Sequence, residues 1–118
     1  MTSSRPVPAQ GEIWDAYLDP VIGHEQAGRR PVLIISNHAF NSLASSLCII
    51  APITSRSRGI ALHVPVPKGE GGLDTTSFVL CDQVRSISHL RLRRLRGQLS
   101  PDVVEMVNTV VSLILFAE

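Results

Sequence analysis

The sequence predicts a β-rich α+β fold: a small, partly open barrel of short strands closed by one C-terminal helix. Three observations support this prediction. Five or more short segments carry apolar runs or period-two alternation, and turn residues separate them. The last segment, from Ser100 onward, repeats apolar residues at helical spacing. With 118 residues, the chain has the size of one domain and is too short for two cores.

The first two strands are predicted within residues 11–36. A short apolar run around Trp14 predicts one strand, and the β-branched run at residues 32–35 predicts a second, buried strand. A long polar loop that contains proline and glycine separates them. Glu25, Arg29 and Arg30 lie where this loop re-enters the sheet, and Pro31 favours an extended Arg30 at the mouth of the strand. Ionisable groups in this position indicate a functional loop, although a hairpin with a polar tip explains the composition equally well.

The middle of the chain predicts further strands. Residues 47–53 form a buried-strand pattern, and Pro52 within it suggests a sheet edge or a bulge. Residues 60–66 alternate between apolar and other side chains, which predicts a strand with one solvated face. The connecting segments are predicted as a loop or short helical turn at 37–46, a basic loop at 55–59 and a turn at 69–72.

The C-terminal part predicts two strands and the helix. Residues 77–84 form a mostly buried strand, residues 86–92 a short turn, and residues 93–99 a last strand broken at Gly97. Ser100, Pro101 and Asp102 supply an N-cap, a first-turn proline and an acid that complements the helix dipole. The apolar stripe that follows predicts a core-facing helix to the end of the chain. These elements together predict an SH3-like or related partly open barrel.

Composition limits the class of protein. Both cysteines, Cys48 and Cys81, lie in apolar strand-like runs, which favours buried small side chains over a disulfide or a metal site. No run is long enough to span a bilayer, and the polar N-terminus lacks the apolar region of a signal peptide, so a reducing cytoplasm fits best. Residues 1–10 are predicted to be a flexible leader, and residues 11–118 a single domain.

The distribution of charge is more informative than the net charge of +1. Ten of the eleven basic residues are arginine, the side chain best suited to bidentate phosphate contact. Five of them lie between Asp82 and Asp102 with no acid among them: Arg85, Arg91, Arg93, Arg94 and Arg96. Such a cluster indicates a polyanionic partner. A solvated strand face and an acidic protein partner are the alternatives, and composition does not separate them.

Three sequence blocks resemble the MazF/PemK/Kid toxins of bacterial type II toxin–antitoxin pairs. The first is Gly-Glu-Ile-Trp, then Asp-Pro, then Gly-x-Glu-Gln-Ala-Gly-x-Arg-Pro-Val-Leu-Ile, which begins at Gly11. The second runs from Ala51 to Ser55 and continues with Arg58-Gly59, and the third is Cys-Asp-Gln-Val-Arg-Ser-Ile from Cys81. The blocks agree in order and spacing, and the resemblance extends from Gly11 to about Leu115.

The resemblance implies a MazF/CcdB-like barrel, usually a homodimer, that acts as an endoribonuclease without metal or cofactor. Such a toxin cleaves single-stranded mRNA at short preferred sequences and so inhibits translation and growth. The 2′-hydroxyl of the RNA attacks, leaving a 2′,3′-cyclic phosphate and a 5′-hydroxyl. The implied partner is a small antitoxin whose disordered, acidic C-terminal segment folds onto the toxin.

The resemblance also places candidate catalytic residues in this sequence. Arg30 can grip the scissile phosphate and stabilise its developing charge, and the hydroxyl of Thr54 can bind a phosphate oxygen. Glu25 is the proton acceptor best suited by pKa, or alternatively a base contact. Candidate RNA-binding residues are Gln26, Arg29, Ser55, Arg56, Arg58, Asp82, Gln83 and Ser86, which have the donors and acceptors needed to bind RNA.

Several of these residues also have a purely structural interpretation. Asp82 can cap backbone amides in a turn that ends a strand, and Trp14 is more typical of a core or interface than of a stacking face. His38, His63 and His89 are interpreted as surface or structural residues, with His63 on the polar side of its strand. His24 is a possible modulator.

Two other functions share the predicted fold. A CcdB-like poison would bind DNA gyrase without cutting RNA, and a silent barrel would only bind RNA or protein. The gyrase poisons depend on a tryptophan-containing C-terminal end, whereas this chain ends in Leu-Ile-Leu-Phe-Ala-Glu. The presence of Arg30 and Thr54 therefore favours the nuclease.

Overall fold

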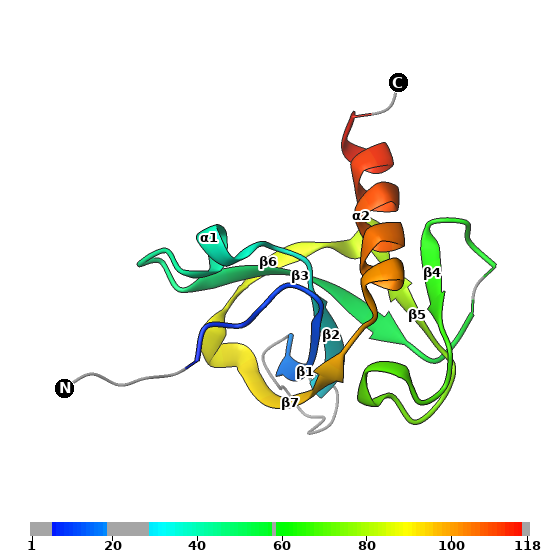
Figure 1. Ribbon diagram of the computed structural model, residues 1–118, viewed down its shortest axis with the longest axis horizontal. Helices are drawn as coiled ribbons and strands as arrows, with labels where there is room; N and C mark the ends of the chain where they lie inside the picture. The colour runs from blue at the N-terminus through cyan, green and yellow to red at the C-terminus, as the bar shows by residue number, and fades with distance from the viewer. Residues whose placement is uncertain (1–5, 19–28, 58, 117–118) are drawn as a thin grey trace.

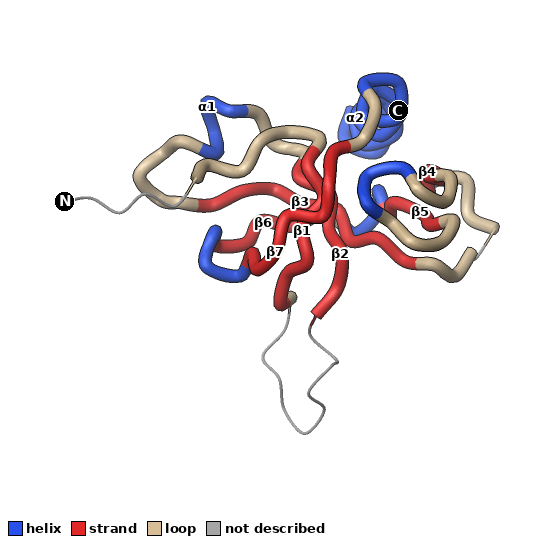
Figure 2. Tube along the Cα trace, turned by 60° about the horizontal axis from the view of Figure 1, so that its bottom comes forward, coloured by secondary structure: helices blue, strands red, loops and turns tan. Residues whose placement is uncertain are grey.

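A computed structural model describes residues 6–18, 29–57 and 59–116. In these residues seven strands form a curled, open sheet in the order β4-β5-β3-β2-β1-β7, and β6 pairs with β3 (Figures 1 and 2). All pairings are antiparallel, and one long helix, α2, follows the last strand. This arrangement confirms the predicted β-rich, partly open barrel with a C-terminal helix.

The strands are β1 (Glu12–Tyr17), β2 (Arg29–Ile34), β3 (Leu47–Thr54), β4 (His63–Val66), β5 (Ser77–Leu80), β6 (Arg85–Ser88) and β7 (Leu92–Gln98). The helices are α1 (His38–Asn41) and α2 (Pro101–Phe116), with short 3₁₀ turns η1 (Glu70–Gly72), η2 (Cys81–Gln83) and η3 (His89–Arg91).

The apolar runs of the sequence supply two hydrophobic clusters. Side chains alternate across a strand, so Val32 and Ile34 of β2 enter one cluster and Leu33 enters the other. The cluster that contains Leu33 also contains Val107 of α2, so the helix covers this part of the sheet. Both strands predicted within residues 11–36 are present as β1 and β2, and the second is buried over residues 32–34 as predicted.

Pro52 lies inside a central strand, so the predicted edge or bulge is wrong. It pairs with Val32 of β2 within an unbroken β3. On its other side β3 pairs with β6 as far as Ile50 and with β5 from Ile53 onward. Pro52 thus occupies the gap where β3 changes partner, a position that tolerates a residue without an N–H group.

Four other predicted boundaries differ from the structure. The strand expected at 60–66 begins at His63, and the strand expected at 77–84 ends at Leu80, where η2 starts. The expected turn at 86–92 overlaps strand β6. This strand forms because its backbone pairs with β3, and its side chains show little alternation in burial. Strand β7 continues through Gly97 instead of breaking there.

Helix α2 begins at Pro101, as predicted. The carbonyl oxygen of Ser100 accepts the first helical hydrogen bonds, from the N–H groups of Val103 and Val104. Val107 is fully buried, but the apolar side chains of the last turn are exposed: Leu113, Ile114, Leu115 and Phe116. The helix projects beyond the sheet (Figure 1), so the prediction that it faces the core to its end is wrong for this turn.

In the described part of the predicted leader, residues 6–10, Pro8 and Gln10 contact the folded domain. Pro8 is fully buried, and its carbonyl oxygen accepts a hydrogen bond of 2.9 Å from Nδ2 of Asn41. Gln10 donates through Nε2 to the carbonyl oxygen of Ile35 at 2.8 Å. Packed structure thus begins before Gly11.

Cys48 and Cys81 are buried, as predicted, and both are free thiols. Within the described residues, no helix is both long and apolar enough to cross a membrane.

Candidate functional site

A cleft of about 1000 Å³ opens where β2 begins and β3 ends. Its walls come from β2, the end of β3 with the loop that follows, the segment before β5, and the turn η2 with Arg85. The lining residues are Leu18, Arg29, Arg30, Pro31, Pro52, Ile53, Thr54, Ser55, Arg56, Leu73, Asp74, Thr75, Ser77, Leu80, Gln83, Arg85 and Arg96.

Arg30 combines a fixed backbone with an exposed side chain. It pairs with Ala16 of β1 inside the β1–β2 ladder, and Pro31 beside it pairs with Asp15. The ladder and the proline ring hold the backbone extended, while the guanidinium group lies in solvent at the cleft. Such a side chain can contact an anion without first losing a protein partner.

Thr54 is the last residue of β3 and is held by two contacts. Its backbone pairs with Phe78 of β5, and its Oγ1 accepts a hydrogen bond of 3.2 Å from the N–H of Arg56. A hydroxyl that accepts in this way still has its own proton to donate. Thr54 can therefore donate to a phosphate oxygen, and the same contact shapes the loop that carries Ser55 and Arg56 along the cleft.

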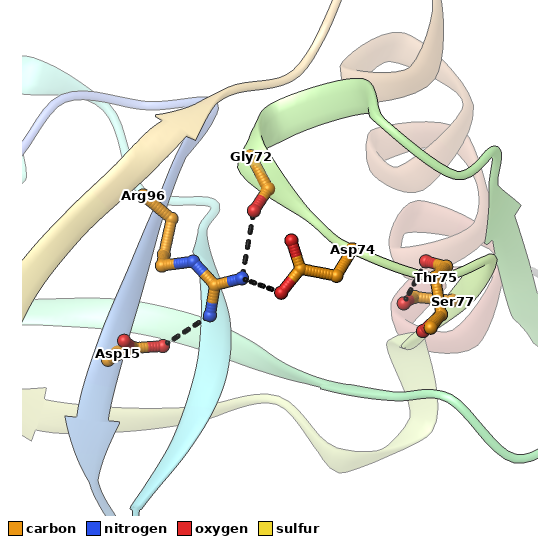
Figure 3. Close-up of polar contacts among 6 residues, drawn as sticks. All are labelled: Asp15, Gly72, Asp74, Thr75, Ser77 and Arg96. Carbon is orange, nitrogen blue, oxygen red and sulfur yellow. Dashed lines mark hydrogen bonds and ion pairs between the residues drawn. The ribbon is translucent and has the colours of Figure 1, made fainter.

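Arg96 also lines the cleft, and its guanidinium group contacts Asp15, Gly72 and Asp74, as Figure 3 shows. Its Nη1 donates to Oδ1 of Asp15 at 3.0 Å, and its Nη2 donates to the carbonyl oxygen of Gly72 at 2.8 Å. Nη2 also lies 3.7 Å from Oδ2 of the exposed Asp74. One guanidinium group thus joins β1, β7 and the segment before β5.

Gly72 is required for this close approach. Its φ is +76°, a left-handed conformation that favours glycine, and an added Cβ would lie 2.2 Å from the carbonyl oxygen of Arg96. The backbone of the 69–75 segment can therefore pack directly on β7, which brings Asp74 and Thr75 to the cleft. Ser77, at the start of β5, donates through Oγ to the carbonyl oxygen of Thr75 at 2.9 Å (Figure 3).

Sequence reasoning did not select Asp74, Thr75 or Ser77. The available signal was a polar run between a glycine turn and an apolar strand, a pattern that turns often show without function. Their place in the cleft depends on the contact between η1 and β7, which sequence spacing does not reveal.

The third predicted block is divided by the structure. Gln83 lines the cleft, but Asp82 and Ser86 do not. Oδ1 of Asp82 lies 3.0 Å from Nε2 of the buried His63, and this contact holds the Asp82 side chain in place. Ser86 pairs with Ile49 within the β3–β6 ladder. His63 is thus a structural residue, and its predicted place on the polar side of the strand is wrong.

Glu25, Gln26, Arg58 and His24 lie outside the described residues. Trp14 packs against a hydrophobic cluster and donates through Nε1 to Oε1 of Glu12 at 3.0 Å, which fits the structural interpretation. Among the described residues, no group of three or more His, Cys, Asp or Glu side chains could hold a metal ion.

The cleft is suited to an anionic polymer. Five arginines line it, and the only described carboxylate among its lining residues is Asp74. The charge of Arg96 is neutralised by Asp15, whereas Arg29, Arg30 and Arg56 lie at the surface of the cleft. Planar guanidinium groups on a rigid sheet match the geometry of phosphate oxygens.

Comparisons with known proteins agree on one family. Residues 9–115 match the family described as PemK-like, MazF-like toxin of type II toxin–antitoxin system. The endoribonuclease PemK of Escherichia coli is 37% identical over 114 residues, covering 87% of this chain and 81% of the relative. The endoribonuclease MazF of Staphylococcus saprophyticus is 35% identical over 106 residues, covering 88% of each chain.

Solved structures show the same fold. The crystal structure of MazF from Deinococcus radiodurans superposes with a TM-score of 0.78 at 31% identity, covering 94% of this chain and 98% of that one. A MazE–MazF structure from the same organism gives a TM-score of 0.74 at 26% identity, covering 97% and 100% of the two chains.

Proposed function

Because this chain belongs to the PemK/MazF family of toxins of type II toxin–antitoxin systems, we propose that it is an endoribonuclease that cleaves single-stranded RNA in the arginine-lined cleft. The observation that carries the proposal is the convergence of Arg30 and Thr54. They lie far apart in the sequence, yet both line one cleft with their polar groups available to a phosphate.

The reaction uses the RNA's own 2′-hydroxyl. Its oxygen forms a bond to the adjacent phosphorus while the bond from phosphorus to the 5′-oxygen breaks. The products are a 2′,3′-cyclic phosphate and a 5′-hydroxyl, so no water is consumed. The 2′-hydroxyl loses its proton to a general base, and the departing 5′-oxygen gains one. Cleavage by this route requires no metal.

Arg30 and Thr54 act on the phosphate. As negative charge builds on the non-bridging oxygens, the guanidinium group of Arg30 donates to them from a rigid strand, the kind of interaction that contributes most to such catalysis. Thr54 donates its hydroxyl proton in a hydrogen bond while Arg56 N–H keeps the oxygen in place. Glu25 is our proposed proton acceptor because a carboxylate is ionised at neutral pH.

The rest of the cleft binds the strand on either side. Arg29, Ser55, Arg56 and Gln83 supply phosphate and base contacts from the cleft wall. Gln26, Arg58, Asp82 and Ser86 are proposed to extend this surface from the loops and the neighbouring strand. Loops generally vary more in sequence than the elements they connect, so we propose that the loops around the cleft set the preferred sequence.

Two partners follow from the family. Solved structures with which this chain superposes include a complex of MazE and MazF, which supports a cognate antitoxin as a partner. We propose that an acidic, disordered C-terminal segment of this antitoxin covers the arginines of the cleft. The exposed apolar turn of α2 supports a homodimer, because such a surface is stabilised when a second copy covers it. We place the protein in the cytoplasm, where mRNA is found.

The test is to incubate the purified protein with a long single-stranded RNA in EDTA and to analyse the new ends. We expect fragments with 2′,3′-cyclic phosphate and 5′-hydroxyl ends. RNA that stays intact while gyrase supercoiling is inhibited would instead identify a CcdB-like poison. Intact RNA without gyrase inhibition would identify a binding protein, and either result would refute the nuclease.

A further inference from the structure

Tyr17 lies between two arginines at the end of β1. The guanidinium carbon of Arg93, on β7, is 5.1 Å from the centre of the Tyr17 ring, and that of Arg29, on β2, is 5.9 Å away. Both distances fall within the range of cation–π contact. The ring is half-exposed and both arginines are exposed, so this cluster of Tyr17, Arg29 and Arg93 belongs to the surface of the molecule.

The backbone is arranged to place Arg93 there. On the β1–β7 ladder, Asp15 pairs with Arg94 and Ala16 pairs with Leu92, so Arg93 is the extra residue of a bulge. A bulge bends its strand and redirects a side chain. Arg91 then donates through Nη1 to the carbonyl oxygen of Tyr17 at 3.1 Å, which ties the end of β1 to the same turn.

The cluster is continuous with the cleft. Arg29 pairs with Tyr17 across the β1–β2 ladder and also lines the cleft beside Arg30. Along β1, Asp15 and Tyr17 point to the same side of the strand, and Asp15 holds Arg96, another residue that lines the cleft. An RNA strand that leaves the cleft past Arg29 therefore reaches Tyr17 next.

Two like charges beside one ring repel each other unless a negative group joins them. Within the described residues, neither Arg29 nor Arg93 forms an ion pair with a carboxylate. A phosphate would compensate both charges, and when the two guanidinium groups turn toward it, the ring face that they cover is uncovered for an unpaired base. Proteins that bind single-stranded RNA combine these two features, an aromatic stacking face and neighbouring arginines.

We propose that Tyr17 and Arg93 form a stacking subsite for one base of the RNA outside the scissile step, with Arg29 and Arg93 holding its phosphate. This inference rests on the proposed ribonuclease function. The subsite adds binding energy for RNA and does not take part in bond breaking. Its base contact is a ring face, so it tolerates different bases.

The test measures binding separately from cleavage. In a Thr54→Ala background, in which we expect cleavage to be blocked, fluorescence anisotropy reports binding of a labelled single-stranded RNA. Loss of one stacking face weakens binding about fivefold or more, so we expect this loss for Tyr17→Leu. Tyr17→Phe keeps the ring and should bind within about twofold of the parent. Phe40→Leu, at a half-exposed aromatic residue of α1, is the matched control and should bind like the parent.

An abasic scan identifies the stacked nucleotide. One abasic position should weaken binding to the parent, and the same position should have no further effect in Tyr17→Leu, because both changes remove the same contact. Arg93→Gln should lower the slope of log affinity against log salt by about 0.7, the value for one phosphate on a single strand. Arg94→Gln removes one positive charge at the residue next to Arg93, and it should leave the abasic pattern unchanged.

Three results would overturn the subsite. One is unchanged binding by a folded Tyr17→Leu variant, and a second is an abasic scan whose effects in Tyr17→Leu equal those in the parent. A Tyr17→Leu protein that loses binding of an antitoxin peptide but not of RNA would also overturn it, because the ring would then serve a protein partner. If the unmodified protein cuts no RNA but the parent still binds RNA through Tyr17, the nuclease proposal fails and the subsite survives.

Discussion

Arg96 of β7 binds Asp15 of the neighbouring strand β1 through a contact of 3.0 Å between Nη1 and Oδ1. Both side chains are largely buried, with 17% and 13% of their surface exposed. This side-chain contact depends on the first register shift between β1 and β7. Ile13 pairs with Gly97 and Trp14 pairs with Leu95, so Arg96 is the extra residue of a bulge. The same guanidinium group holds Gly72, so it fixes the wall of the cleft.

We expect Arg96→Gln to destabilise the fold, because it leaves the carboxylate of Asp15 in a largely buried site without its cation. The loss should be about 2 kcal/mol or more in the free energy of unfolding, measured by urea denaturation. The double variant Asp15→Asn with Arg96→Gln should be less destabilised than the two single changes added together. Additive effects would show that the two side chains do not stabilise each other.

Arg30→Ala and Thr54→Ala should each lower the rate of RNA cleavage by about two orders of magnitude or more, the usual effect of removing a transition-state donor. Both side chains lie outside the hydrophobic clusters, so the thermal unfolding temperature should stay close to that of the unmodified protein. The rate is read from a fluorogenic single-stranded RNA. Arg85→Ala removes a positive charge elsewhere in the cleft and serves as a comparison. Full cleavage by either folded variant would remove that residue from the active site.

Local signals explain what could be predicted of the fold. Ser100 and Pro101 mark the start of α2 because capping depends on adjacent residues, and the dense apolar run of β3 marks a buried strand wherever its partners lie. Strand β6 could not be found in this way, because only Ile87 of its residues is buried and its conformation comes from pairing with β3. The bulges of β7 likewise arise from its register with β1, which no local pattern encodes.

The same distinction applies to the site. Arg30, Thr54 and Gln83 were selected by family resemblance, and the structure brings these three to one cleft. Asp82 belongs to the same sequence block as Gln83, yet it contacts the buried His63. This contact depends on how β4, which carries His63, packs beside η2, which carries Asp82. The Arg96–Asp15 pair and the Tyr17 cluster depend on long-range register, so sequence alone could not reveal either one.

The last turn of α2 should carry part of a subunit interface. Leu113 is 56% exposed and Phe116 is 79% exposed, and they supply the apolar side chains of one shallow depression on α2. Replacing both by glutamate would place charges where the proposed second copy packs, so we expect a monomer by size-exclusion chromatography with light scattering at micromolar concentration. Ser45→Glu, in the loop after α1, is the charge control and should remain a dimer. An unchanged dimer in the Leu113/Phe116 variant would place the interface elsewhere.

The two buried thiols should make stability fall in alkaline solution. Burial raises the pKa of Cys48 from 9.0 to about 11, and burial followed by the charge of Asp82 raises the pKa of Cys81 to about 11 as well. Between these values the unfolded chain loses protons that the folded chain keeps. The thiol contribution to stability is therefore fully present below pH 9 and is lost as the pH rises toward 11.

Urea unfolding at several pH values checks this expectation. The unmodified protein should lose stability steeply between pH 9 and about 11. A variant with Cys48→Ala and Cys81→Ala should be less stable at neutral pH, because each change leaves a small cavity. It should nevertheless show a flatter decline over the same range. Parallel declines would mean that other groups cause the alkaline loss.

RNA and antitoxin should compete for the arginines of the cleft. Arg56 is exposed in the loop after β3, where a phosphate or a carboxylate-rich segment can reach it. Arg56→Glu reverses its charge and should weaken both ligands, measured with a labelled single-stranded RNA and with the C-terminal peptide of the cognate antitoxin. Binding of RNA should fall more steeply with salt than binding of the peptide, because RNA also releases condensed counterions.

Lys68→Glu reverses the charge of an exposed residue that does not line the cleft, and it should affect neither ligand as strongly. A ternary complex of toxin, peptide and uncut RNA with undiminished affinities would show that the two ligands bind separate sites.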